Sequence, residues 1–186
     1  MKRFLAVALF VVLVAALVNP TAYAQNAFNK KDMVLSAGIG LGMYGLYGSS
    51  TLPPIFVAFE TGVADKITAG GLVAYSGSSE DFVYGSWKYT YIVISARASY
   101  HFLENNKNID AYAGAGLGYD IVSSSATWKT AADQQLYGNF YSASASYFFF
   151  DVHLGARYYF SPKFAAMGEL GYGVGFLRLG LSYKLN

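Results

Sequence analysis

The sequence predicts an all-β protein, an eight-stranded antiparallel up-and-down transmembrane β-barrel. Apolar residues recur at every second position in eight segments, and nearly all charges in those segments share the opposite face. Hydrophobic residues make up 54% of the chain and aromatic residues 18%, yet no segment after the N-terminal apolar run offers the ~20 apolar residues of a spanning helix. Because successive side chains of a strand point to opposite faces, this pattern gives each strand one apolar and one polar side.

The N-terminus predicts export. The chain begins Met-Lys-Arg, continues through an uncharged apolar run over residues 4–18, and reaches a small-x-small site at residues 22–24. This pattern is typical of a secretory signal peptide, and the run is too short for a membrane anchor. We expect residues 1–24 to be a cleaved signal peptide and residues 25–186 to form one β-barrel domain.

Charge and cysteine content exclude other classes. Removal of the signal peptide takes two of the 13 basic residues and leaves 11 against 11 acidic residues, a net charge of zero. The mature chain therefore lacks the basic excess of nucleic-acid-binding proteins. It has no Cys, so a disulfide and a lipid-modified N-terminal cysteine are both excluded.

The first four strands follow in order. Residues 32–44 alternate Met, Leu, Ala and Ile with Ser and Gly. Residues 55–64 set Ile, Val and Phe against Ala, Glu and Gly, and residues 67–76 set Ile, Ala, Val and Tyr against Thr, Gly, Ala and Ser. Residues 89–102 place Ile, Ala, Tyr and Phe opposite Ser, Arg and His. Each segment has the two-residue period of a half-buried strand.

The last four strands repeat the pattern. Residues 109–122 alternate Ile, Ala, Leu and Tyr with Asp, Tyr and Gly. Residues 148–160, FFFDVHLGARYYF, separate Phe, Val, Leu and Tyr from Asp, His and Arg. Residues 164–174 and 177–185 set bulky apolar residues against Gly, Ser, Glu, Arg and Lys. An even number of strands is typical of bacterial outer-membrane barrels.

The connections alternate between short and long. Polar turns follow the second, fourth and sixth strands, and longer connections rich in Gly, Ser and Tyr are expected at residues 46–54, 77–88 and 123–145. Short periplasmic turns and long extracellular loops are typical of outer-membrane barrels. Loop 123–145, with Trp128, Lys129 and Tyr137, is the expected contact region for an extracellular ligand, although a solvated loop would look the same.

The two faces differ in size as well as polarity. A soluble lipocalin-like barrel would turn its apolar face inward, but Phe, Leu, Ile and Tyr would overfill so narrow a lumen. The bulky face is therefore expected to contact lipid, and the face of Gly, Ala and Ser to line the lumen. The lumen face also carries the charges, which are Glu60, Arg97, Asp110, Asp120, Asp151, Arg157, Glu169, Arg178 and Lys184.

Charges inside a narrow barrel need partners, because an unpaired buried charge is strongly destabilising. We expect a lumen polar network in which three arginines bridge four carboxylates, with a histidine beside them, although the pattern assigns no particular pairs. Its members are Glu60, Arg97, Asp120, Asp151, His153, Arg157, Glu169 and Arg178. A lumen filled in this way leaves no wide channel.

Aromatic residues on the lipid face fall into two belts, as expected at the two membrane interfaces. The periplasmic belt contains Tyr100, Phe102, Tyr158, Phe160, Phe164 and Tyr183, and the outer belt contains Tyr75, Tyr119 and Tyr172.

Together, the signal peptide, the eight alternating segments and the aromatic belts resemble the small OmpA/OmpX-type outer-membrane barrels, the outer membrane protein beta-barrel domain families. In the last strand, Arg178, Gly180, Tyr183 and Leu185 resemble the signal that these families present to the barrel assembly machinery, but Leu185 replaces the usual terminal aromatic and Asn186 follows it. The resemblance implies residence in the bacterial outer membrane, among its lipids and lipopolysaccharide.

Catalytic and metal sites are weakly supported. Ser99 and His101 share one strand face, and Glu60 or Glu169 could complete a Ser/His/acid set, but such a set depends on geometry that spacing does not show. His153 beside Asp151 is a poor metal site with only two His and no Cys in the chain. We expect no catalytic residues, no metal and no cofactor.

The sequence thus favours a structural or surface-interaction protein of the outer membrane that acts through its extracellular loops. Passive transport of small or apolar solutes through a narrow lumen is the alternative, and a lipopolysaccharide-modifying barrel enzyme comes third.

Overall fold

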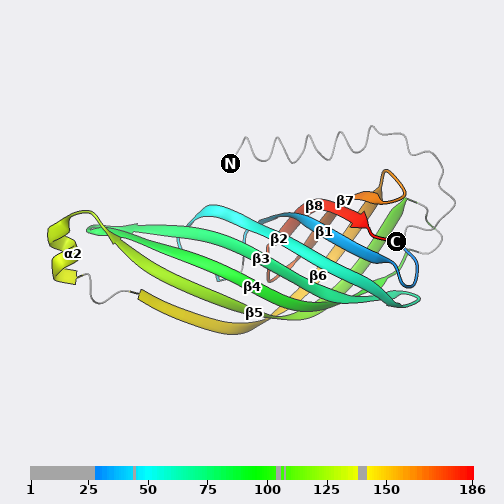
Figure 1. Ribbon diagram of the computed structural model, residues 1–186, viewed down its shortest axis with the longest axis horizontal. Coiled ribbons are helices and arrows are strands. Elements are labelled where there is room, and N and C mark those ends of the chain that lie inside the picture. The colour runs from blue at the N-terminus through cyan, green and yellow to red at the C-terminus, as the bar shows by residue number, and fades with distance from the viewer. Residues whose placement is uncertain (1–27, 44, 104–105, 107, 138–141) are drawn as a thin grey trace.

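The chain closes into a single barrel. The computed structural model describes residues 28–186 except 44, 104–105, 107 and 138–141, so the expected signal peptide lies outside the described residues. Each strand pairs antiparallel with its neighbour in sequence, and the last pairs with the first (Figure 1). The strands are β1 (Met33–Leu41), β2 (Ser49–Ala64), β3 (Ile67–Phe82), β4 (Gly85–His101), β5 (Ile109–Trp128), β6 (Ser142–Tyr159), β7 (Phe164–Tyr172) and β8 (Leu177–Lys184). The expected eight-stranded up-and-down barrel is confirmed.

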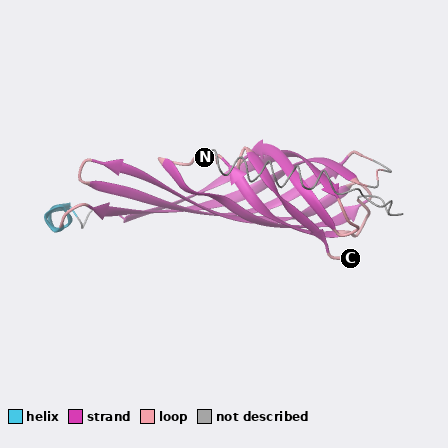
Figure 2. Ribbon diagram, turned by 90° about the horizontal axis from the view of Figure 1, so that it is seen from above, coloured by secondary structure: helices cyan, strands magenta, loops and turns pink. Residues whose placement is uncertain are grey.

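Strand length divides the molecule into a barrel and an extension. β5 has 20 residues, whereas β7 has 9 and β8 has 8. The long strands run past the short ones toward α2 (Ala131–Tyr137), as Figures 1 and 2 show. We call the part of β2–β6 beyond the ends of β7, β8 and β1 the extension.

The extension corrects the expected long loops. β3 and β4 stay paired to Phe82↔Gly85, and β4 and β5 to Gly85↔Trp128. Much of 46–54, 77–88 and 123–145 is therefore strand rather than loop. Gly and Ser favour turns in isolation, but once two strands pair in register the antiparallel ladder satisfies their backbone groups whatever the side chain.

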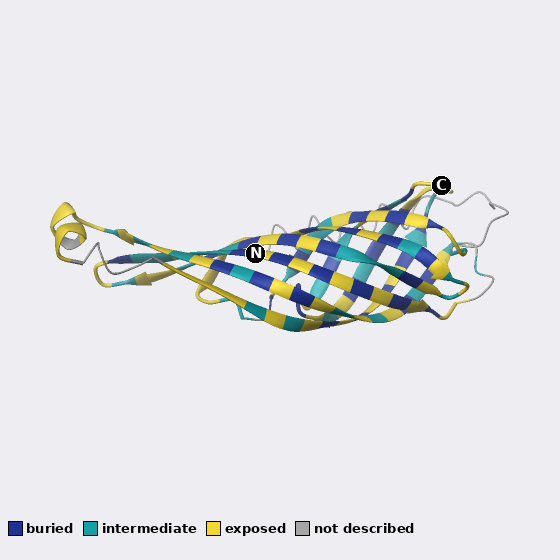
Figure 3. Cartoon of the chain, turned by 60° about the horizontal axis from the view of Figure 1, so that its bottom comes forward, coloured by how far each residue is buried: buried dark blue, intermediate teal, exposed yellow. Residues whose placement is uncertain are grey.

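The alternation separates the two faces as expected. The nine charged residues assigned to the lumen are each 4% exposed or less, whereas Leu117 is 60% and Leu154 54% exposed. Figure 3 shows buried and exposed residues alternating along the strands. Lys88, which has the parity of the lipid face, is exposed on the extension. Tyr100, Phe164 and Tyr119 of the two aromatic belts lie on the outer surface.

Inside, the lumen has a polar half and an apolar half. All the charged lumen residues except Asp120 occupy the half nearer the chain termini, and an apolar cluster occupies the half nearer the extension. The buried members of this cluster are Met43, Phe56, Ala58, Leu72, Ala74, Tyr91, Val93, Val122, Met167 and Val174. The alternating pattern did not predict this apolar half, because most of its residues share a strand face with Gly, Ser and charged neighbours. The expectation that Met43 and Val174 lie on the lipid face is wrong, since they are 8% and 1% exposed. Each follows a glycine of positive φ, Gly42 or Gly173, where the extended strand and its alternation end.

Candidate functional site

Glycines make room for the charged side chains in the lumen. A Cβ at Gly155 would lie 2.6 Å from Tyr112 Cζ and 2.7 Å from Glu169 Cγ. A Cβ at Gly114 would collide with the His153 ring. These Gly positions lie within strands, where a missing side chain lets a neighbour approach closely. The interior is therefore packed by large polar side chains set opposite glycine.

Seven of these side chains form a continuous chain of alternating charge, which we call the charge chain. It runs in the order Asp110, Arg157, Glu60, Arg97, Glu169, Arg178, Asp151. Its members come from β2, β4, β5, β6, β7 and β8. Each arginine lies between two carboxylates, so no arginine is left without a charge partner. Except for Glu169 and Arg178, which face each other across the β7–β8 hairpin, neighbours in this order are at least 27 residues apart in the sequence, which is why spacing alone could not pair them.

The distances within the charge chain are those of direct ion pairs. Arg97 Nη2 donates to Glu169 Oε1 at 2.7 Å, and its Nε lies 3.5 Å from Glu60 Oε1. Arg157 donates to Glu60, and its Nη1 donates to Asp110 Oδ2 at 3.2 Å. Arg178 Nε lies 2.9 Å from Glu169 Oε2, and Arg178 Nη1 lies 3.2 Å from Asp151 Oδ2. These two contacts are ion pairs without hydrogen-bond geometry. Each buried arginine of the charge chain thus has carboxylate oxygens within ion-pair distance on both sides.

Tyr112 supports the middle of the charge chain. Its hydroxyl donates to Glu169 Oε1 at 2.8 Å. Its ring lies beneath the Arg157 guanidinium, 4.4 Å from the ring centroid to Cζ. One aromatic side chain therefore contacts both a carboxylate and a cation of the chain.

Two histidines join hydroxyl groups to the ends of the charge chain. His153 Nδ1 lies 2.7 Å from Asp151 Oδ1, and its Nε2 lies 2.9 Å from Ser99 Oγ. His101 Nδ1 lies 2.5 Å from Asp110 Oδ1, and its Nε2 lies 3.1 Å from Thr68 Oγ1. Each set has the connectivity of a hydroxyl, imidazole and carboxylate triad.

Burial limits what these sets can do chemically. Ser99 is 2% exposed, His153 5% and Asp151 1%. Ser99 Oγ also donates to Glu60 Oε1 at 3.1 Å, which places a negative charge beside the hydroxyl. A substrate could reach this hydroxyl only if the lumen opened, so the arrangement as it stands satisfies buried polar groups.

The terminal end of the barrel is also closed by side chains. Phe28 stacks on the His101 ring, with centroids 3.9 Å apart. Lys184 Nζ lies 2.8 Å from Asp32 Oδ2 and 4.9 Å from the centroid of the Tyr159 ring. Ser36 and Ser182 share a hydrogen bond of 2.8 Å between β1 and β8.

The structure brings together seven of the eight residues expected in the lumen polar network. Asp120 is the exception, because it lies apart and accepts a hydrogen bond of 2.9 Å from the Tyr147 hydroxyl. The expectation that an arginine bridges Asp120 is wrong: it sits in the apolar half, beyond the three arginines. Sequence reasoning placed Asp110 in the lumen but not in the network, and it missed Tyr112 and Thr68, although all three have the lumen parity.

The residues expected to form the assembly signal point to both faces. Arg178 belongs to the charge chain, whereas Leu185 is 43% exposed. Tyr183 packs against Phe164, with ring centroids 4.7 Å apart. The role of these residues in assembly stays a prediction.

Neither metal-binding clusters nor spanning helices are found in the described part of the chain. No group of three or more His, Asp or Glu residues there could hold a metal ion. Among the same residues, no helix is both long and apolar enough to cross a membrane.

Solved structures of other proteins share this fold, whereas comparisons of the sequence find no relative. No family model matches the chain, and no curated protein matches it either. Among solved structures, the N-terminal β-barrel domain of Pseudomonas aeruginosa OprF is similar with a TM-score of 0.55 and 16% identity over 85% of this chain and 100% of that one. Ail, the attachment invasion locus protein of Yersinia pestis, is similar with a TM-score of 0.51 and 13% identity over 84% of this chain and 99% of that one. Ail in complex with the heparin analogue sucrose octasulfate gives a TM-score of 0.50 at 12% identity, over 83% and 96% of the two chains. The chain thus has the fold of eight-stranded transmembrane β-barrels.

Proposed function

We propose that this chain is an integral protein of the bacterial outer membrane, whose barrel is a closed anchor and whose extension contacts partners outside the cell. The charge chain is the observation that carries the proposal. Its seven side chains come from six of the eight strands, and each is 4% exposed or less. A lumen filled by paired charges holds its shape and resists the passage of ions.

Conductance in planar bilayers tests the closed lumen. The purified protein should give no reproducible channel steps. The double variant Arg97→Ala with Glu169→Ala removes the three ion pairs that these two residues make and most of the volume of both side chains, so it should give steps or raised leakage. Reproducible steps from the unchanged protein would instead favour the alternative function, passive transport of small or apolar solutes.

The extension supports the contact role. Several of its rings lie in mutual contact, with centroids 5.7 Å apart for Phe82 and Trp128 and 6.2 Å for Phe82 and Trp87. Tyr89 adds a third contact, 6.5 Å from Trp87. Clustered aromatic side chains are enriched at recognition surfaces. Ail, whose name describes attachment and invasion, has been solved with a heparin analogue.

A trimmed variant tests the contact role. Replacing residues 79–88 by a two-residue turn shortens the β3–β4 hairpin while leaving the lipid-facing segments intact. Cells that display this variant should bind immobilised heparin and matrix proteins less than cells that display the unchanged protein at equal surface density. Equal adhesion of the two would count against an interaction role for the hairpin.

Outer-membrane residence has its own test. The proposed partners are outer-membrane lipids, lipopolysaccharide and the barrel assembly machinery. The protein should fractionate with the outer membrane, and N-terminal sequencing should begin at Gln25 if residues 1–24 are a cleaved signal peptide.

A barrel hydrolase is a further candidate, favoured by the Ser99, His153 and Asp151 geometry. An alkyl fluorophosphonate, which labels activated serines, tests it directly. We expect no adduct on the folded protein, because Ser99 is 2% exposed. An adduct on Ser99 that is lost in His153→Ala would favour catalysis, including the modification of lipopolysaccharide.

A further inference from the structure

β6 loses its partner on one side partway along its length. β5 and β6 stay paired from Ile109↔Tyr158 to Ser125↔Ser142. β6 and β7 stay paired only from Tyr159↔Ala165 to Val152↔Tyr172. Among the described residues, positions 142–151 of β6 therefore have no strand neighbour on the β7 side.

Part of this free edge carries large apolar side chains on the lipid face. Phe148 is 82% exposed and Phe150 71% exposed on the outer face of β6. Phe148 packs against Tyr119 of the outer belt, with ring centroids 4.9 Å apart. Hydrocarbon offers no hydrogen bonds to a strand edge, so a free edge at this depth is costly. Above the β7–β8 turn, β6 therefore has one unpaired edge although the ring of strands below it is closed.

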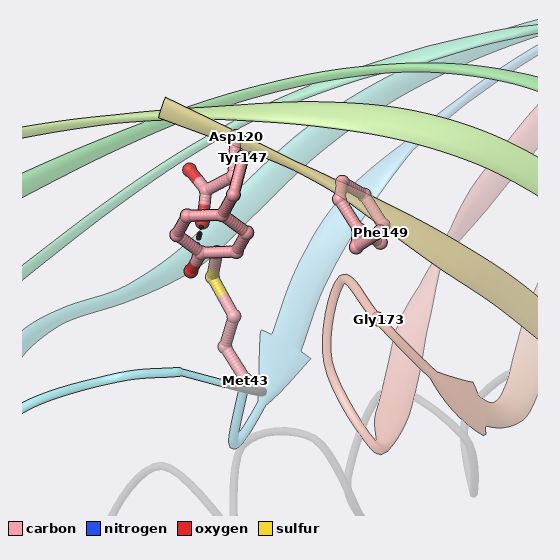
Figure 4. A pocket seen from close by; sticks show the side chains of 5 residues that line it. All are labelled: Met43, Asp120, Tyr147, Phe149 and Gly173. Atoms are coloured by element: carbon pink, nitrogen blue, oxygen red, sulfur yellow. Dashed lines mark hydrogen bonds between the residues drawn. The ribbon is translucent and has the colours of Figure 1, made fainter. Parts of the chain in front are cut away.

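Behind the free edge lies a small recess in the apolar half of the lumen. It is lined by Met43, Asp120, Tyr147, Phe149 and Gly173 (Figure 4), and as it stands it has room for about one water molecule. A Cβ at Gly173 would lie 3.0 Å from Phe149 Cε2 and 3.3 Å from the Phe150 carbonyl oxygen. The Phe149 ring therefore packs directly against the β7–β8 turn where both line the recess.

One oxygen in the recess lacks a partner. Asp120 is 1% exposed, and its Oδ2 accepts the hydrogen bond from Tyr147. Its Oδ1 is buried and has no hydrogen-bond partner among the described residues. A buried carboxylate oxygen favours a donor, so it would accept a hydroxyl or an amine and repel a carboxylate or phosphate.

We propose that this recess binds a single-chain amphiphile from the outer leaflet, with a hydroxyl or amine head at Asp120. The hydrocarbon chain of the ligand lies against Met43 and Phe149 and leaves the barrel between β6 and the β7–β8 turn. The Phe149 side chain moves away from Gly118 and Gly173, against which its ring packs, to admit the ligand. This site lies at the base of the extension and does not involve the aromatic cluster of Phe82, Trp87 and Trp128.

Photo-crosslinking in phospholipid nanodiscs tests the proposal. The probes are four twelve-carbon chains with a diazirine near the head, ending in an amine, a hydroxyl, a methyl group or a carboxylate. The amine and hydroxyl probes should label residues 143–151 and 173–176 at least tenfold more than the other two. Equal labelling by all four probes, or labelling spread evenly around the barrel, would overturn the proposal and indicate ordinary lipid contact.

Two variants sharpen the test. Asp120→Asn should reduce labelling by the amine probe at least tenfold, whereas the same change at the exposed Asp65 should leave it unaltered. Phe149→Ala should increase labelling, because it widens the opening. Heat-modifiable gel migration shows whether each variant is folded. If Asp120→Asn does not fold, the comparison of the four probes on the unchanged protein still tests the binding site. Unchanged labelling of folded Asp120→Asn would refute the assigned role of the carboxylate.

Discussion

Arg97 of β4 donates to Glu169 of β7 at 2.7 Å, joining two strands that are not neighbours across the interior of the barrel. The pair lies at the centre of the charge chain, where Arg97 also contacts Glu60 and Glu169 also contacts Arg178. Both side chains are almost fully buried.

Removal of either partner alone should therefore destabilise the barrel strongly. We expect Arg97→Met to lower the free energy of unfolding by roughly 3–5 kcal/mol, because it leaves Glu60 and Glu169 without their shared cation. The double variant Arg97→Met with Glu169→Met should recover part of the loss. Urea unfolding in lipid vesicles, followed by tryptophan fluorescence, measures the cycle. Additive losses in the double variant would mean that the two side chains act independently.

Glycine at position 155 should be required by packing. Gly155→Ala places a Cβ against Tyr112 and Glu169, and such overpacking typically destabilises by about 1–3 kcal/mol. Gly168→Ala is the matched control, since its nearest neighbour would be Leu179 Cδ2 at 3.6 Å. The same unfolding measurement should give a lower free energy of unfolding for Gly155→Ala than for Gly168→Ala. Equal values would show that the side chains around Gly155 can move to accommodate a Cβ.

The lipid face should reject charge at mid-strand. Leu154 is 54% exposed on the outer side of β6, so Leu154→Arg should destabilise the protein by roughly 2–4 kcal/mol. Ser144→Arg lies on the same face of the same strand but in the extension, and it should have little effect. A small loss at both positions would mean that Leu154 does not face hydrocarbon, which the yield of folded protein in vesicles would also reveal.

The last strand should control the rate of assembly. If Arg178, Gly180, Tyr183 and Leu185 form the assembly signal, Leu185→Phe should speed insertion by the barrel assembly machinery, because it restores the usual terminal aromatic. Tyr183→Ala should slow it. Tyr158→Ala removes an aromatic from the same belt outside the signal and is the control. The measurement is the appearance of folded protein in proteoliposomes, and equal slowing by both Tyr variants would assign the effect to the belt rather than to the signal.

The sequence by itself determined the fold and the side of the wall on which each charge lies. A two-residue period is a local property, and the parity of Arg97 or Glu169 within its own strand was enough to place it in the lumen. The same parity placed Leu154 and Leu117 on the outside. The order of the strands also followed, since short turns join antiparallel neighbours.

Only the tertiary structure decided which groups meet and where the strands end. Glu60 pairs with Arg157, 97 residues away, because barrel closure fixes the relative height of every strand, and no local pattern encodes that height. The same relative heights of the strands place Asp120 beyond the arginines, toward the extension. They also bring Ser99 within hydrogen-bond distance of His153 rather than of His101, its neighbour on the same strand face. The expected loops became an extension for a related reason: strand pairing is a property of two segments, and Gly-rich and Ser-rich stretches that favour turns alone are held straight by a partner in register.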